Sequence, residues 1–216
     1  AAARERASAA AASTAEAPPP PTMQMGLNEL QQATNSFDDS RIIGRGGYGT
    51  VYKAELFRTY KAAVKRLDGT QGEDEINREV ELLSRCHHRN LMPLFAYCLD
   101  RSALCLVYPL AVGGSLLDRF ILTNDAKSRL ALLGCTDPSP LPWRLRCRIL
   151  CEALRGLSYL HGLTPQVLHR DVKPPNVLLD EDGHARLADV GLAKEGIEAQ
   201  QTHMTTRNMS GTPGYV

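Results

Sequence analysis

The sequence has little of what would mark a membrane or nucleic-acid protein. No apolar run approaches the roughly 18 residues that span a bilayer, and the N-terminus has no continuous apolar segment of signal-peptide type. A surplus of one charge is also missing, because 25 Lys and Arg nearly balance 24 Asp and Glu and leave a net charge of +1. We therefore expect neither nucleic acid nor a membrane surface as the main partner.

Paired cysteines are absent as well. The six cysteines are scattered, most of them inside apolar stretches, and none has the CxxC spacing of a zinc site or a redox dithiol: Cys86, Cys98, Cys105, Cys135, Cys147 and Cys151. We expect reduced, buried thiols in a cytoplasmic protein. Tethering of that protein to the inner face of a membrane, through regions outside this chain, stays open.

The composition is that of a globular domain, with 43% hydrophobic and 23% charged residues among 216. Its first part differs, because it is rich in Ala, then runs through Pro18–Pro21, and has no apolar residue larger than Ala up to Thr22. Such a segment cannot offset the entropy cost of ordering, so we predict a disordered linker over 1–26. A short Ala-driven helix is the alternative.

Residues 27–40 form a lead-in, after which short strands are predicted. They are β-branched and aromatic stretches separated by Gly and Asp turns, at Ile42–Ile43, Val51–Tyr52, Ala63–Val64 and Leu104–Tyr108. We expect one antiparallel sheet. A helix interrupts it, because Ile76, Val80 and Leu83 recur at i, i+4 and i+7 and share one face.

A second helix is predicted from Trp143, just after a proline, to Gly162. Leu150, Leu154, Leu157 and His161 fall in register along it. Two short strands follow, at 177–179 and 185–187, joined by an acidic turn that ends in glycine. The order is a β-rich small lobe of about 41–109 and a helix-rich large lobe of about 110–216, an α+β bilobal fold.

The first chemical signal is GxGxxGxV, formed by Gly44, Gly46, Gly49 and Val51. Alone it is weak, because dinucleotide-binding folds share GxGxxG. In those folds a helix follows the glycines, whereas here a returning strand follows, so the glycines tip a hairpin whose backbone amides can lie over phosphates. A glycine-rich surface hairpin without a ligand is the plain alternative.

Lys65 follows on the next predicted strand, inside an apolar run. A lone buried ammonium is costly, so it needs a partner, and Glu79 on the intervening helix is the natural one. An isolated strand Lys is more often a surface residue whose charged end reaches water. The glycine hairpin before it and the carboxylate after it favour the functional interpretation.

Residues 169–176 read HRDVKPPN and place Asp171, Lys173 and Asn176 on one loop. These are a proton acceptor, a phosphate neutraliser and a metal ligand. Asp189 then supplies a second carboxylate after a strand, suited to Mg²⁺ that also holds phosphate oxygens. Each could be a solvated charged loop on its own, but the full ordered set makes coincidence negligible.

This ordered set resembles the eukaryotic protein kinase signature, from the glycine loop to Gly214. Within that superfamily, four segments resemble plant receptor-like kinases and their animal relatives, the Pelle and interleukin-receptor-associated kinases: 27–37, Cys86–Leu91, Gly114–Arg119 and Leu192–Lys194. The resemblance covers about 27–216. It implies a protein serine/threonine kinase that transfers the γ-phosphoryl of ATP to protein hydroxyls, with Mg²⁺.

The resemblance also implies the role of each site residue. Gly44, Gly46, Gly49 and Val51, with Ile43 beside them, would cover ATP, and Lys65 would hold its α and β phosphates while paired to Glu79. Ala63 and Leu178 would sandwich adenine, and the stretch from Tyr108 to Leu110 would form the hinge that hydrogen-bonds it. Asp171 would accept the substrate proton, Lys173 would steady the γ-phosphate, and Asn176 and Asp189 would bind Mg²⁺.

Arg170, beside the catalytic Asp, resembles kinases that are activated by phosphorylation of a nearby loop. The phosphate would come from autophosphorylation at Thr202, Thr205, Thr206 or Ser210. The Lys at the second position after Asp171, and Gly211–Tyr215, resemble serine/threonine kinases and not tyrosine kinases.

Three departures from the family pattern stand out. Val190 replaces a Phe that packs under the regulatory helix near Leu83, Leu94 and His169, a loss of about 1–3 kcal/mol of packing if nothing fills the space. The chain ends at Val216 where the family continues, so we expect an incomplete large lobe of low stability and low activity. An insert at about 123–142 is predicted to be a tolerated surface loop.

Two other classes of function remain as rivals. A nucleotide-binding pseudokinase scaffold is suggested by Val190 and by the missing end, but all the catalytic side chains are retained. A dinucleotide-dependent oxidoreductase fails on the strand that follows the glycines.

Overall fold

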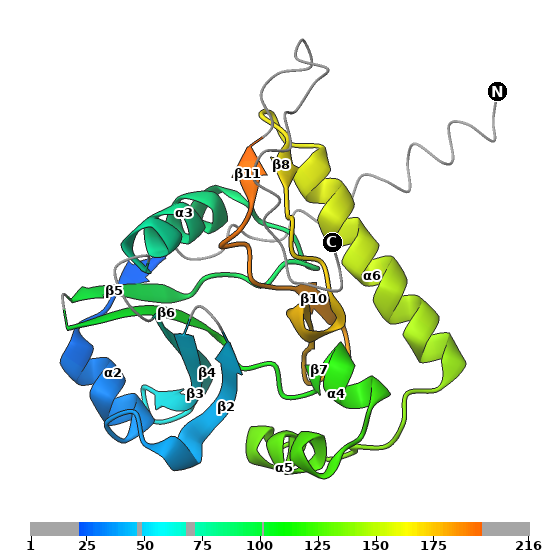
Figure 1. Cartoon of the computed structure of the whole chain (residues 1–216), viewed down its shortest axis with the longest axis horizontal. Coiled ribbons are helices and arrows are strands. Elements are labelled where there is room, and N and C mark those ends of the chain that lie inside the picture. The colour runs from blue at the N-terminus through cyan, green and yellow to red at the C-terminus, as the bar shows by residue number, and fades with distance from the viewer. Residues whose placement is uncertain (1–21, 47–48, 68–71, 101, 196–216) are drawn as a thin grey trace.

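The structure, a computed structural model, describes residues 22–46, 49–67, 72–100 and 102–195 of the chain. Two lobes are visible, with a sheet on one side and the long helix α6 (Trp143–His161) on the other (Figure 1). The predicted bilobal α+β fold is confirmed. The predicted phosphorylation sites and most of the predicted linker lie outside the described residues.

The small lobe is built on a six-stranded sheet in the order β1-β5-β6-β4-β3-β2. Its strands are β1 (Met23–Gln24), β2 (Ile42–Gly46), β3 (Gly49–Leu56), β4 (Tyr60–Leu67), β5 (Ala96–Asp100) and β6 (Ala103–Pro109). The pairings are antiparallel except that β1 runs parallel to β5. The predicted strands are confirmed, whereas the linker prediction over 1–26 is wrong at β1, where Met23 pairs with Ala96.

The lead-in segment covers the outer face of this sheet. Helix α2 (Leu27–Thr34) packs on β3, and the 3-10 turn η1 (Asp39–Arg41) leads into β2. Gly26 N–H donates to Glu29 Oε2 at 2.9 Å, which satisfies a free backbone donor at the start of α2. The buried Leu30 of α2 joins a core cluster with Val64 and Val107, so the lead-in is part of the small lobe.

Helix α3 (Gly72–Arg85) crosses the other side of the sheet, and its predicted apolar face is confirmed. Ile76 and Leu83 are buried and Val80 packs against the same cluster. On the same helix, Glu79 is fully buried, whereas Arg78 is exposed. A buried carboxylate needs strong partners, and this singles out Glu79 within α3.

The large lobe begins with β7 (Gly114–Ser115), and its described residues form the helical elements α4 (Leu116–Phe120), α5 (Asn124–Leu133), α6 and the 3-10 turn η2 (Pro174–Asn176). Its strands form two small sheets. Strands β9 (Val177–Leu179) and β10 (Ala185–Leu187) pair with β7 in the order β10-β9-β7, and β8 (Val167–Leu168) pairs with β11 (Lys194–Glu195). The hairpin of β9 and β10 has the bounds that the sequence predicts.

The prediction of a surface loop for the insert at about 123–142 is wrong over its first half, which forms the helix α5. Thr123 Oγ1 accepts a hydrogen bond from Ala126 N–H at 3.1 Å, which caps the start of α5, and Gly134, with φ +89°, ends it in the left-handed region. Cap residues and a buried Leu130 therefore define a true helix. The two cap residues are visible in the sequence, but the spacing of apolar residues over such a short segment is weak evidence for a helix.

Helix α6 has the predicted bounds but buries a different face from the leucine series predicted for it. Leu150 and Leu154 of that series are 49% and 62% exposed. The buried face consists of Ile149, Ala153, Gly156 and Leu160, and it packs on β10. Gly156 is required there, because a Cβ would lie 2.6 Å from the carbonyl oxygen of Asn90.

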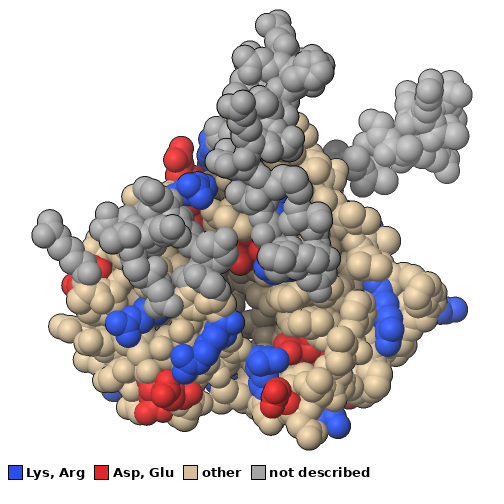
Figure 2. Space-filling view, viewed as in Figure 1, with Lys and Arg blue, Asp and Glu red and all other residues tan. Residues whose placement is uncertain are grey.

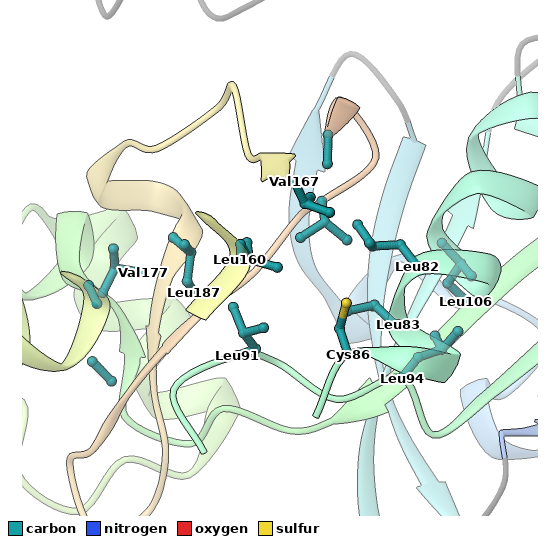
Figure 3. Packing of buried hydrophobic residues seen from close by; sticks show 14 of the residues in the cluster. Leu82, Leu83, Cys86, Leu91, Leu94, Leu106, Leu160, Val167, Val177 and Leu187 are labelled. Atoms are coloured by element: carbon teal, nitrogen blue, oxygen red, sulfur yellow. The ribbon is translucent and has the colours of Figure 1, made fainter. Parts of the chain in front are cut away.

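One hydrophobic cluster runs through both lobes (Figure 3). It brings Leu82, Leu83 and Cys86 of α3 together with Leu160 and Leu187 of the large lobe. Val190 is part of the same cluster and is 2% exposed. This burial agrees with the family resemblance, in which a Phe at this position packs under the regulatory helix. The two lobes therefore share one hydrophobic cluster beside α3.

The six cysteines are all free, but only three of them are buried: Cys86, Cys98 and Cys105. Burial raises the pKa of the Cys105 thiol to about 12, so it stays protonated. Cys151 is exposed, which corrects the expectation that all six are buried. Among the described residues, no helix combines the length and the apolar character needed to cross a membrane.

Candidate functional site

A cavity of about 430 Å³ lies between the two lobes. The space-filling view shows the hollow between the sheet side and the α6 side of the molecule (Figure 2). Twelve residues predicted from the sequence line it: Ile43, Gly44, Gly46, Gly49, Val51, Ala63, Lys65, Tyr108, Leu110, Asn176, Leu178 and Asp189. Residues up to 146 positions apart, from 43 to 189, thus converge on one cavity of ligand size.

The glycine hairpin forms the roof of this cavity. Strands β2 and β3 are antiparallel and Gly46 pairs with Gly49, so a strand follows the glycines, as predicted. Gly49 has φ +140°, and a Cβ there would collide with the carbonyl oxygen of Arg66 on β4. Only glycine fits this position without strain, which leaves the backbone bare over the cavity.

Lys65 and Tyr108, which both line the cavity, each contact an acidic side chain. Lys65 Nζ on β4 lies 3.1 Å from Asp189 Oδ1, and both side chains are mostly buried. Glu79 Oε1 on α3 accepts a hydrogen bond from the hydroxyl of Tyr108 at 2.6 Å. The pairing of Lys65 with Glu79 stays a prediction.

The loop at 169–176 is organised around the buried Asp171. Lys173 Nζ lies 2.7 Å from Asp171 Oδ2, and Asn176 Nδ2 donates to the same oxygen at 2.8 Å. Asn176 also donates to the Asp171 carbonyl, and Asp171 N–H donates to His169 Nδ1 at 3.3 Å. The three polar residues of the predicted motif are therefore in direct contact.

His169 is the buried support of this loop. Burial lowers its pKa below the usual 6.5, even though Asp189 and Asp171 act in the opposite direction. The imidazole is therefore neutral near neutral pH and can accept the hydrogen bond from Asp171 N–H through its Nδ1. A neutral ring is also the form that a buried position tolerates.

The segment after Asp189 is tied to α3. Asp189 has φ +65°, a backbone conformation that non-glycine residues rarely adopt, so surrounding contacts must hold it. One such contact is the hydrogen bond from Arg78 Nη1 of α3 to the Gly191 carbonyl at 2.7 Å. Val190, between these two residues, faces the core.

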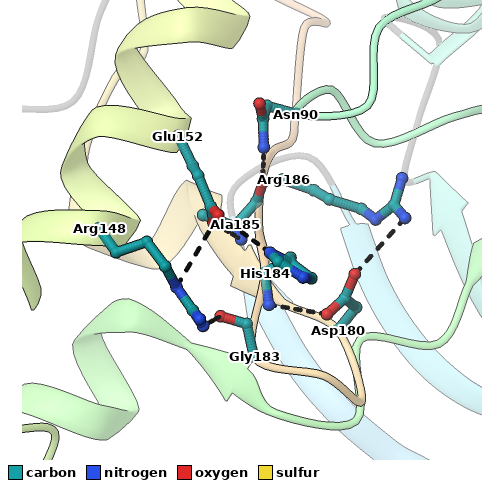
Figure 4. A network of polar contacts seen from close by, with 8 residues as sticks. All are labelled: Asn90, Arg148, Glu152, Asp180, Gly183, His184, Ala185 and Arg186. Carbon is teal, nitrogen blue, oxygen red and sulfur yellow. Dashed lines mark hydrogen bonds and ion pairs between the residues drawn. The ribbon is translucent and has the colours of Figure 1, made fainter. Parts of the chain in front are cut away.

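A polar network fixes the hairpin that leads into the site (Figure 4). Glu152 of α6 accepts from Ala185 N–H at 2.7 Å and lies 2.9 Å from His184 Nδ1. Burial favours the neutral acid, but these hydrogen bonds and the nearby Arg148 lower the pKa of Glu152 overall. Asn90 Nδ2 donates to the Ala185 carbonyl at 2.9 Å. These contacts therefore fix the hairpin, and with it the loops that precede and follow it, relative to α6.

The hinge, which we define as residues 108–111, differs in detail from the expectation. Leu110 N–H donates to the Lys61 carbonyl at 3.2 Å, so it is already bonded inside the sheet. Pro109 has no N–H. The next residue, Ala111, also lines the cavity and was not predicted. Only its position directly after the predicted hinge residues could have identified Ala111 as a cavity residue from the sequence.

Sequence reasoning also missed an outer wall of the cavity. It consists of Ser115, Asp118, Arg129 and Leu133, from β7, α4 and α5. The last two belong to the insert, which was expected to be a loop without function. Only recognition of α5 as a packed helix could have placed them here.

The oxygen ligands for a divalent cation are limited to a few groups. Asp189 and Asn176 both line the cavity and offer carboxylate and carboxamide oxygens. In the described part of the chain, no cluster of three or more His, Cys, Asp or Glu side chains could hold a metal by itself. Two protein ligands fit Mg²⁺, which keeps waters and commonly takes the rest of its ligands from substrate phosphates.

Comparison with known proteins agrees with this arrangement. The family profile described as "Protein kinase domain" matches residues 37–216. This chain is a member of the protein kinase family. Its relatives place it in the receptor-like kinase and Pelle type.

Two of these relatives come from Arabidopsis thaliana. "Receptor-like protein kinase THESEUS 1" is 42% identical over 191 residues, which cover 87% of this kinase chain and 21% of the relative. "Serine/threonine-protein kinase CDG1" is 42% identical over 190 residues, covering 87% and 41%. The kinase chain thus spans less than half the length of both relatives.

Proposed function

We propose that this protein is a serine/threonine kinase that transfers the γ-phosphoryl of ATP to hydroxyl groups of proteins. One observation carries the proposal: Lys65 and Asp189 meet at one end of a cavity roofed by glycine strands, with Asn176 bonded to Asp171 beside them. Such a site positions phosphates and neutralises their charge, which is most of what phosphoryl transfer needs.

The cavity would bind the nucleotide in one direction. Adenine would lie between Ala63 and Leu178, which line the cavity from opposite lobes, and would hydrogen-bond the hinge. The phosphates would then point toward Lys65, under the bare backbone of the glycine strands. Burial of Lys65 strengthens its attraction for phosphate, because little water screens it.

Asp171 would act on the substrate hydroxyl. Lys173 and Asn176 hold its Oδ2 and so fix the carboxylate, which would orient the hydroxyl and accept its proton. Lys173, 2.7 Å away, would steady the transferred phosphoryl group. A Lys at this position favours serine and threonine as acceptors, and one relative is named a serine/threonine-protein kinase.

Asp189 and Asn176 would hold Mg²⁺. The cation, when bound, supplies positive charge that neutralises the phosphate oxygens. Asp189 would keep its carboxylate aimed into the cavity through Lys65 and through the contact of Arg78 with Gly191. We further propose regulatory autophosphorylation at one of Thr202, Thr205, Thr206 and Ser210, opposite Arg170, in a cytoplasmic setting.

The test is phosphate transfer from γ-labelled Mg·ATP to a generic basic protein by the full-length wild-type protein and by its Asp171→Asn variant. Asp182→Asn, an exposed change in the turn of the hairpin, is the matched control. We expect transfer by the wild type and the control and a loss of at least about 100-fold in Asp171→Asn. ATP binding without transfer in the wild type would instead favour a pseudokinase scaffold.

Mass spectrometry of the protein after incubation with Mg·ATP tests the autophosphorylation proposal. Phosphate is expected on at least one of the four named residues of the wild type and on none of them in Asp171→Asn. Phosphate confined to other segments would contradict it.

A further inference from the structure

Helix α5 is a rigid part of the fold with a buried face. Leu130 is 0% and Ala126 is 2% exposed. Leu130 lies so close to Gly114 of β7 that a Cβ on this glycine would collide with it. Tight packing on β7 fixes the position of α5 along the outer rim of the cavity.

The same helix also touches the small lobe. Lys53 Nζ on β3 donates to the Leu132 carbonyl, near the end of α5, at 2.6 Å. Helix α5 also contacts β2, so it lies beside the roof strands (Figure 1). It is therefore a second connection between the lobes, in addition to the hydrophobic cluster beside α3.

Arg129 is the polar side chain of α5 that lines the cavity. Its Nε and Nη2 donate to Asp118 Oδ1 at 3.1 and 2.8 Å. Asp118 Oδ2 accepts from Ser115 Oγ at 2.8 Å and from Ser115 N–H at 3.3 Å. Each carboxylate oxygen thus has two donors, which fills its usual acceptor capacity.

Arg129 keeps one donor group for a ligand. Its Nη1 makes no hydrogen bond to any residue in the described part of the chain. The side chain is 38% exposed and lines the cavity, whereas that of Asp118 is 7% exposed. The polar contact available on this rim is therefore a donor from Arg129.

The position of Arg129 along the cavity indicates which part of the nucleotide it would contact. Under the proposed function, on which this inference rests, the base lies at the hinge and the phosphates lie at Lys65. The ribose must join the two and pass the outer rim. We propose that Arg129 Nη1 donates a hydrogen bond to a ribose hydroxyl of the bound nucleotide, with α5 as the wall on the ribose side.

Equilibrium binding of Mg·ATP and Mg·2′,3′-dideoxy-ATP tests this assignment. We expect the wild type to prefer ATP on the order of tenfold, the value of one hydrogen bond from a charged group. Arg129→Met should bring this ratio close to one and leave the affinity for the dideoxy nucleotide nearly unchanged. Lys127→Met, which removes a charge from the exposed side of α5, should keep the wild-type ratio.

The double variant Asp118→Asn/Arg129→Met excludes a substitute contact. If the ratio persists in Arg129→Met and falls only in the double variant, Asp118 binds the ribose and the assignment is overturned. Equal weakening of both nucleotides by Arg129→Met would also overturn it, because it would show an effect of charge without a ribose contact. Failure of the wild type to bind ATP at all would instead refute the proposed function, and melting temperatures identify any variant that does not fold.

Discussion

Replacement of Arg78 by Met is expected to lower phosphate transfer about tenfold while the protein stays folded. Arg78 Nη1 is 2.7 Å from the Gly191 carbonyl, two residues after Asp189. One hydrogen bond from a charged group is worth about 1.5–3 kcal/mol, and the exposure of Arg78 places it at the lower end. About 1.5 kcal/mol corresponds to roughly a tenfold change in the population of the arrangement that aims Asp189 into the cavity.

The neighbouring Val190 makes this contact more important. Val190 is buried under α3 where the resemblance predicts a larger Phe, so packing alone joins α3 to this segment less strongly. A Val190→Phe change adds apolar contact with the α3 side of the cluster. In that background, the loss caused by Arg78→Met should shrink to about threefold or less, which a double-mutant cycle measures directly.

The assay is kcat/KM for transfer to a protein substrate, combined with hydrogen exchange of residues 189–193. Arg78→Met should lower kcat/KM and speed exchange there, Arg78→Lys should restore part of both, and Arg155→Met, an exposed change on α6, should alter neither. Wild-type kcat/KM in Arg78→Met would contradict a role of this contact in positioning Asp189. A loss that is the same with Val and with Phe at position 190 would contradict its coupling to Val190.

Three further predictions concern stability and pH. Burial lowers the pKa of His169 below 6.5, so below this pH the unfolded chain binds more protons than the folded protein does. The stabilisation is therefore complete above pH 6.5 and decreases as the pH falls below it. His169→Gln should make the melting temperature depend less on pH between about pH 7.5 and about 5.5. Glu152→Ala leaves the buried Ala185 N–H without its acceptor and should cost about 1–3 kcal/mol in urea unfolding, whereas Glu181→Ala in the exposed turn should change stability by less than about 0.5 kcal/mol. Gly49→Ala forces a side chain into a left-handed position against β4 and should cost at least about 1–3 kcal/mol and weaken ATP binding, read by unfolding and by calorimetry; unchanged values would contradict the roof geometry.

The parts of the fold that could be predicted from the sequence are those that a single local sequence pattern determines. The strand after Gly49, the apolar face of α3 and the hairpin around Gly183 follow from period, turn residues and glycine placement, and all three are present. The residues that line the cavity could be predicted because a fixed chemistry needs those residue types in a fixed order.

The remaining features depend on contacts between distant segments. The buried face of α6 is decided by β10 and by the close approach of Asn90 to Gly156, which no spacing within α6 reveals. Helix α5 is stabilised by its packing on β7 and by Lys53, a residue 79 positions before Leu132. Such tertiary contacts override weak local preference, so the role of the insert needed the structure.

The most direct test of the central claim is phosphoamino-acid analysis after incubation of the protein with a basic protein substrate and Mg·ATP labelled at either the α or the γ phosphate. Label is expected from the γ position only, on serine and threonine, and it should be lost in Asp171→Asn. Nucleotide bound in the cavity with no label transferred, or label on tyrosine alone, would contradict it.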